Sequence, residues 1–172
     1  CNYANPGVYT AKAMVERGSL SSQGSVVINV TGPASLPTSL GITILARNIT
    51  AGQTSFGDPV SAKPLDKIEF QIQVSNNAGI AYNVVLKNIT PTQLIYLGNL
   101  KVNGVANSGS ILSPGITLGD MASGSPRLIT FESQLAPDSS FAFGNNDVIN
   151  TVIASVNNTA GSDAITLTVQ RV

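Results

Sequence analysis

The chain has 172 residues, with nine basic and nine acidic side chains and a formal net charge of zero. Only 10% of its residues are charged, against about 25% in an average globular domain, so the charge pattern favours neither nucleic acid nor an anionic membrane as partner. Histidine, the commonest general base and metal ligand, is absent, and we therefore expect no catalytic site, no metal and no cofactor.

Short segments of alternating apolar and polar residues predict an all-β protein, because β-branched residues dominate the apolar positions. Asn103-Gly104, between two apolar segments, predicts a two-residue hairpin. No run of about 18 apolar residues occurs, so we expect no transmembrane helix. The predicted strands are residues 8–15, 25–31, 42–49, 67–75, 82–88, 93–97, 100–102, 105–112, 127–135, 148–156 and 164–170. Strands of this number and spacing suit a two-sheet, immunoglobulin-like antiparallel sandwich.

Residues 1–41 are predicted to be an N-terminal extension ending in a Gly- and Pro-rich linker. In its first strand, Tyr9, Ala11, Ala13 and Val15 share one face. This strand has two interpretations: it completes its own sandwich, or it is a donor strand that adds to a neighbouring subunit. A donated strand makes a head-to-tail contact that need not close, and such contacts generate filaments.

Cys1 is the sole cysteine, so no disulfide can form within the chain. We expect a mature form from which a signal segment has been removed, because the sequence does not begin with Met. Cys1 then has three interpretations: a lipid-modified residue of a bacterial lipoprotein, a partner for Cys1 of another chain, or an incidental residue at a processing site.

The most regular strand lies in residues 64–91, where Ile68, Phe70, Ile72 and Val74 alternate with Lys67, Glu69, Gln71 and Gln73. One face of this strand is therefore apolar and is expected to lie on the core. If the N-terminal strand is donated, these four apolar residues are the predicted acceptor groove of the neighbouring subunit. The motifs that follow are Asn76, then Asn88-Ile-Thr-Pro91, and later Asn150-Thr151.

The order of these motifs, beginning with Pro64-Leu65-Asp66, resembles the Ig-like repeat family called "domain of unknown function 11", found on microbial cell surfaces. The resemblance covers about residues 42–172 and implies an Ig-like sandwich there. Leu65 stands where the family usually has Gly, and Asn88 stands where it usually has Asp. The resemblance also implies an extracellular, cell-surface location.

Four glycosylation sequons are present, and their acceptor residues are Asn29, Asn48, Asn88 and Asn157. Chance occurrence is a competing explanation, since the chain is rich in Asn and Thr. Covalent glycans are therefore candidate partners rather than established ones.

Two functions are favoured by the sequence, and neither is enzymatic. A third hypothesis, glycoside hydrolysis by the carboxylates of Glu69 and Glu132, is disfavoured because both occupy polar positions of ordinary strands, where a solvated face explains them better. In the first, the chain is an extracellular structural subunit that assembles with copies of itself into a pilus-like filament or surface layer by N-terminal strand exchange. In the second, it is a lipid-anchored or cell-wall adhesin that binds a glycan or host partner through its loops. Phe141, Phe143 and Tyr96 are the aromatic residues to test for such adhesion.

Overall fold

A computed structural model of the chain describes residues 7–30, 39–157 and 159–172. The chain divides into two compact units, Cys1–Ser35 and Leu36–Val172. Each unit is described by itself. Among the described residues, no helix is long and apolar enough to cross a membrane.

The first unit contains a two-stranded antiparallel ribbon formed by β1 (Gly7–Arg17) and β2 (Leu20–Val30). The two strands pair along their whole length, from Gly7 opposite Val30 to Arg17 opposite Leu20. Gly18 makes the reversal with a φ of 62°, in the left-handed region that suits glycine. The expected N-terminal strand is therefore one half of a hairpin rather than a single extended segment.

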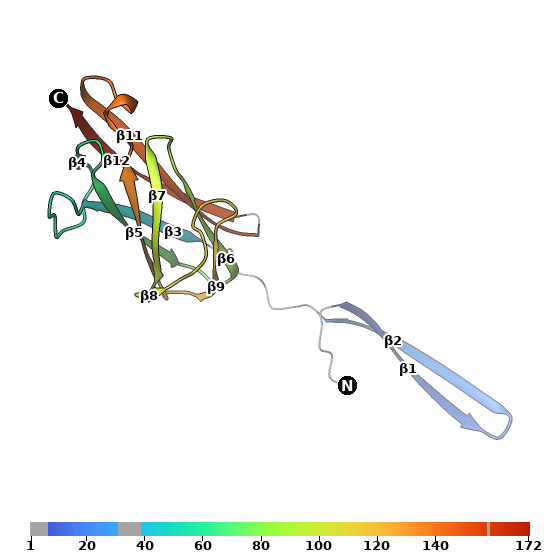
Figure 1. Cartoon of the computed structure of the whole chain (residues 1–172). Helices are drawn as coiled ribbons and strands as arrows, with labels where there is room; N and C mark the ends of the chain where they lie inside the picture. The colour runs from blue at the N-terminus through green and yellow to red at the C-terminus, as the bar shows by residue number, and fades with distance from the viewer. Residues whose placement is uncertain (1–6, 31–38, 158) are drawn as a thin grey trace. The chain divides into compact units, whose positions relative to one another are not determined.

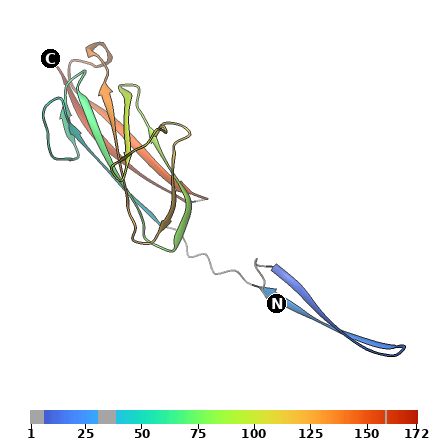
Figure 2. The same ribbon diagram turned by 60° about the horizontal axis from the view of Figure 1, so that its bottom comes forward.

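The second unit is a sandwich of two five-stranded sheets, as predicted (Figures 1 and 2). One sheet has the order β3-β5-β10-β7-β8 and the other the order β4-β12-β11-β6-β9. All pairings are antiparallel except that of β4 with β12. The strands are β3 (Leu40–Asn48), β4 (Val60–Ala62), β5 (Lys67–Asn76), β6 (Ile80–Ile89), β7 (Leu94–Val102), β8 (Val105–Ala106), β9 (Ile116–Ala122), β10 (Arg127–Leu135), β11 (Gly144–Val156) and β12 (Thr159–Arg171), with a single 3-10 turn, η1 (Asp138–Ser140).

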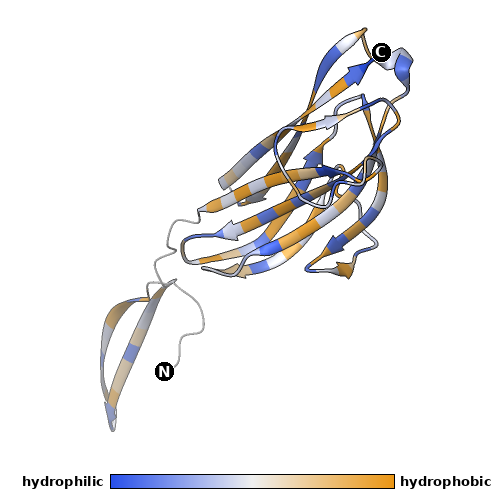
Figure 3. Ribbon diagram, turned by 90° about the vertical axis from the view of Figure 1, so that its left-hand side faces the viewer, coloured by the Kyte–Doolittle hydropathy of each residue, from blue (hydrophilic) through white to orange (hydrophobic). Residues whose placement is uncertain are grey.

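One hydrophobic core lies between the two sheets. Its centre contains Phe70 and Phe131, whose rings stack with centroids 4.9 Å apart. Along the strands, buried and exposed residues alternate, and Figure 3 shows this as bands of opposite hydropathy. This period of two places every second side chain in the core.

The first and the last described residues of the sandwich lie at opposite ends of its sheets. Leu40, at the start of β3, lies beside Gly161, whose added Cβ would come within 2.8 Å of the Leu40 carbonyl oxygen. From Gly161, β12 runs the length of the sheet to Arg171, opposite Gly144. The ten residue steps from Gly161 to Arg171 span about 33 Å, so the chain enters the sandwich at one end and leaves at the other.

Most predicted strands are confirmed, but three differences have physical causes. The Asn103-Gly104 hairpin forms as predicted, with φ values of 50° and 79°. The strand predicted at 105–112 is wrong beyond Ala106, because Ile111 instead turns into the core, where its side chain is fully buried. The segments 93–97 and 100–102 are one strand, β7, which carries two positive-φ residues. β4 and β9 were not predicted.

Candidate functional site

The ribbon presents an apolar face, and its sheet contains only β1 and β2 among the described residues. Paired residues of an antiparallel ladder project to the same side, and the sidedness predicted for β1 continues across β2. We define the ribbon apolar face by its eight apolar residues: Tyr9, Ala11, Ala13, Val15, Leu20, Val26, Ile28 and Val30. Several of these side chains are largely exposed, at 71% for Val15, 75% for Leu20 and 58% for Val26.

The four predicted acceptor residues on β5 do not line an open groove. Ile68, Phe70, Ile72 and Val74 are all 0% exposed and belong to the core. β5 also has both of its edges paired, with β3 on one side and β10 on the other. The apolar alternation was interpreted correctly as a core face, but the sandwich fills that face with its own side chains.

The outer edge of β3 is closed by other parts of the sandwich. The Ile44 N–H donates to the carboxylate of Asp163 at 2.8 Å, which ties β3 to β12 of the other sheet. Ala46 exchanges backbone hydrogen bonds with Gly57. The Asn48 N–H donates to Oε1 of Gln53 at 2.8 Å. Since unpaired edge groups invite pairing with another chain, these contacts protect β3 from adding a foreign strand.

Two motif asparagines, 62 positions apart, meet inside the second sheet. Asn88 Nδ2 donates to Asn150 Oδ1 at 3.0 Å, and Asn150 Nδ2 donates back to Asn88 Oδ1 at 2.9 Å. Asn88 Nδ2 also donates to Oγ1 of Thr90 at 2.7 Å. Both asparagines are buried, at 3% and 0% exposure. These reciprocal hydrogen bonds therefore join β6 to β11 and have a structural role.

The Pro64-Leu65-Asp66 motif forms a tight turn despite its leucine. The Asp66 N–H donates to the Lys63 carbonyl at 3.1 Å, which closes a four-residue turn with Pro64 second and Leu65 third. Leu65 has a φ of 68°, and this third position with positive φ is where a type II turn favours glycine. The turn aims the Asp66 carboxylate at Asn48 Nδ2, 2.7 Å away.

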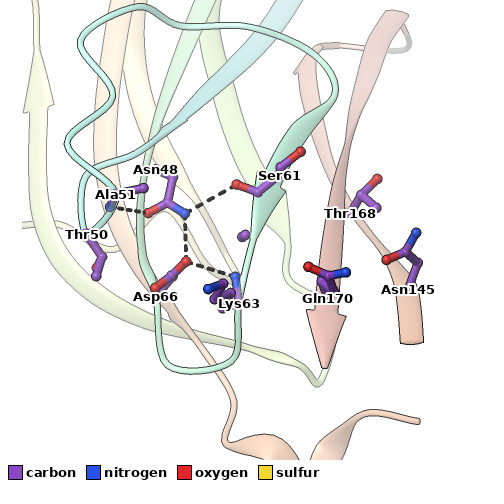
Figure 4. A pocket seen from close by; sticks show the side chains of 10 residues that line it. Asn48, Thr50, Ala51, Ser61, Lys63, Asp66, Asn145, Thr168 and Gln170 are labelled. Atoms are coloured by element: carbon purple, nitrogen blue, oxygen red, sulfur yellow. Dashed lines mark hydrogen bonds between the residues drawn. The ribbon is translucent and has the colours of Figure 1, made fainter. Parts of the chain in front are cut away.

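Asn48 and Asp66 form one wall of a surface hollow of about 450 Å³ (Figure 4). Asn48 is 1% exposed; its side chain accepts from the Ala51 N–H and donates to the Ser61 carbonyl as well as to Asp66. Across the hollow lie Asn145, Thr168 and Gln170 on β11 and β12. The two walls are joined because β4 pairs with β12. The sequence did not single out this hollow.

Two of the four candidate glycosylation residues, Asn48 and Asn88, are buried in the folded protein. Asn48 and Asn88 are buried and their amides are already hydrogen-bonded, so their nitrogens are not accessible to a glycosylating enzyme. Asn29 on β2 and Asn157 in the turn after β11 are exposed. The alternation along the strands distinguishes the buried Asn48 and Asn88 from the exposed Asn29 and Asn157. Asn48 and Asn88 occupy the alternate positions of β3 and β6 whose side chains face the core.

Other candidate groups are dispersed. Glu69 and Glu132 are opposite each other on β5 and β10, but Glu69 forms an ion pair with Arg47 at 2.5 Å. Of the aromatic residues, Phe141 is 5% exposed and Phe143 is 77% exposed, while Tyr96 packs on Phe131. No group of three or more metal-ligating side chains occurs among the described residues. Cys1 lies outside the described residues.

No protein-family model matches the chain. A search of curated proteins also gave no match.

Among solved structures, the chain is similar to BcpA, the major pilin subunit of Bacillus cereus, with 12% identity and a TM-score of 0.49 over 93% of this chain and 47% of BcpA. It is similar to domains 4 and 5 of the S-layer protein SbsC, with 14% identity and a TM-score of 0.31 over 96% of this chain and 59% of that one. A family 123 glycoside hydrolase from Clostridium perfringens gives 12% identity and a TM-score of 0.43 over 81% of this chain and 28% of the hydrolase. The chain thus spans less than two thirds of each, and similarity at this level carries no argument about function.

Proposed function

We propose that the chain is an extracellular structural subunit that assembles with copies of itself, into a thread or a surface layer, through its N-terminal ribbon. The observation that carries this proposal is the ribbon apolar face. An isolated two-stranded hairpin is marginally stable in water, and this ribbon cannot bury its apolar residues between its own two strands. A second copy of the chain is the partner that we propose for it.

Covering this face supplies a driving force for association. Val15, Leu20 and Val26 are each more than half exposed, and burying the exposed part of each contributes about 1 kcal/mol. Both outer edges of the ribbon are also open, since β1 and β2 pair with no other described strand. Ladder hydrogen bonds to a neighbour can therefore add to the apolar contact.

The sandwich has the features of a unit in a linear assembly. Leu40 and Arg171 lie at opposite ends of the sandwich, so a contact made at one end does not occupy the other. The protected edge of β3 supports assembly through the ribbon, because uncontrolled edge-to-edge pairing of sandwiches is disfavoured there. Head-to-tail contacts of this kind extend without closing.

The extracellular part of the proposal is supported by composition and by the motif order. A chain with only 10% charged residues has few charges to place on its surface, which suits a protein that packs against its own copies and does not favour dispersal at high concentration. The resemblance to the Ig-like surface repeats points to the same location. We propose no catalytic role.

A matched pair of substitutions on β2 tests the proposal. Val26 lies opposite Ala11 on the ribbon apolar face, and Val27 lies opposite Thr10 on the other face. The two valines are similarly exposed, at 58% and 66%. Val26→Glu and Val27→Glu therefore make the same chemical change with a similar effect on the ribbon itself.

We expect Val26→Glu to block assembly and Val27→Glu to leave it intact, measured by sedimentation velocity. Burying the new carboxylate against an apolar partner costs about 3 kcal/mol, which weakens association more than a hundredfold. Assembly that survives Val26→Glu, or that both substitutions abolish equally, contradicts the assignment of the interface to this face.

A further inference from the structure

The hollow between Asn48 and Gln170 has polar groups that the fold does not use. The structure gives no partner, among the described residues, to the side-chain amides of Asn145 and Gln170, to the Lys63 ammonium group or to the Ser61 hydroxyl. All of these residues border the hollow, and Figure 4 shows the two amides across the hollow from Asn48 and Asp66. The remaining wall groups are fixed by hydrogen bonds within the protein.

The chemistry of these groups selects a class of ligand. Asp66 is the sole carboxylate among the described residues that border the hollow, and one of its oxygens already accepts from Asn48 Nδ2 and from the Lys63 N–H. The hollow therefore offers little of the carboxylate charge with which proteins hold a hard cation. Lys63 is the sole cation that borders the hollow, and Asp66 offsets its charge, so an anion is disfavoured. The only apolar side chains that border it are those of Ala51 and Ala62, which offer little to an apolar ligand.

We propose that this hollow binds a neutral saccharide. An amide group offers both donors and an acceptor, which matches the neighbouring hydroxyl groups of a sugar ring. Asn145 and Gln170 lie opposite each other in the β11–β12 ladder, so their amides stand side by side and can engage one ring together.

The walls are held in place before any ligand arrives. Asn48, the last residue of β3, is fixed by its bonds to Ala51, Ser61 and Asp66. Because Ser61 belongs to β4, the β4–β12 pairing holds this wall beside the wall that β12 forms. Binding therefore requires little ordering of the backbone, which favours affinity from a small number of hydrogen bonds. This inference is independent of assembly through the ribbon.

Saturation-transfer difference NMR on the full chain tests the proposal, since it observes the ligand whether or not the protein is assembled. The probes are maltose, cellobiose, lactose and N,N′-diacetylchitobiose, with 3′-sialyllactose as an acidic comparison. We expect saturation transfer to at least one neutral disaccharide. Asn145→Ala combined with Gln170→Ala should weaken that binding at least tenfold, because each lost hydrogen bond contributes about 1 kcal/mol.

Gln73→Ala is the matched control, because it removes an exposed amide from the outer face of β5, away from the hollow. It should leave saturation transfer unchanged, and thermal unfolding should show that all three substitutions preserve the fold. Transfer to none of the neutral disaccharides, transfer only to 3′-sialyllactose, or transfer that persists in the double variant each overturns the proposal.

Discussion

Removing one member of the Asn88–Asn150 pair should destabilise the sandwich strongly. Asn150→Ala deletes the two hydrogen bonds of 2.9 and 3.0 Å, each with a net contribution of about 1 kcal/mol. It also removes the donor to the side-chain oxygen of Asn88, a residue that is 3% exposed. Leaving this oxygen buried without that hydrogen bond costs about 1 to 2 kcal/mol more. The expected loss in the free energy of unfolding is thus about 3 to 4 kcal/mol, which lowers Tm by about 10 °C.

The assay is urea unfolding followed by circular dichroism, in a chain that also carries Val26→Glu so that association does not contribute to stability. A double-mutant cycle tests the pairing directly: Asn88→Ala and Asn150→Ala together should cost at least about 2 kcal/mol less than the sum of the single changes. The two shared hydrogen bonds are lost only once in the double variant, and neither asparagine is left buried without its partner. Gln73→Ala, an exposed amide, should cost less than about 0.5 kcal/mol. Additive losses, or a loss below about 1 kcal/mol for Asn150→Ala, would refute the argument.

Three further outcomes are expected. Leu65→Gly should stabilise the sandwich by about 0.5 to 1 kcal/mol in urea unfolding, because it relieves a positive φ of 68° at the modest entropic cost of glycine; a loss of stability would contradict the turn geometry. Burial raises the pKa of Tyr96, and a hydrogen bond from the backbone of Ile111 opposes this effect. The free energy of unfolding should therefore keep the contribution of the neutral Tyr96 below about pH 10 and lose it as the pH rises through the raised pKa. Tyr96→Phe should abolish this loss of stability at alkaline pH. In a host that performs N-glycosylation, mass spectrometry should find glycan on Asn29 or Asn157 alone; modification of the buried Asn48 or Asn88 would show that addition precedes folding.

The sheets were predictable from sequence because apolar residues alternate along long strands such as β5 and β10. β4 was not predicted because three residues are too few to show an alternating pattern, and because its pairing partner, Leu167–Val169, is distant in the sequence. β9 escaped because Gly119, with a φ of 75°, interrupts its alternation at a shift in register with β6. In β2 the first half is rich in Ser and Gln, and it is strand only because β1 continues to pair with it.

The site was less predictable because it depends on contacts between distant residues. Asn88 and Asn150 were both singled out as motif residues, but their reciprocal bonds depend on the pairing of β6 with β11. The same holds for the hollow, which forms only because the end of β3, with Asn48, and the end of β12, with Gln170, are neighbours in the fold. The sidedness of Tyr9, Ala11, Ala13 and Val15 was predictable, since it follows from the pleat of a single strand.

Electron microscopy of the unmodified chain in dilute buffer, with no partner added, tests the central claim most directly. If the ribbon apolar face of one subunit is covered by the next, regular threads or ordered layers should form, and the chain carrying Val26→Glu should give separate particles. Separate, uniform particles of the unmodified chain would contradict self-assembly as its function.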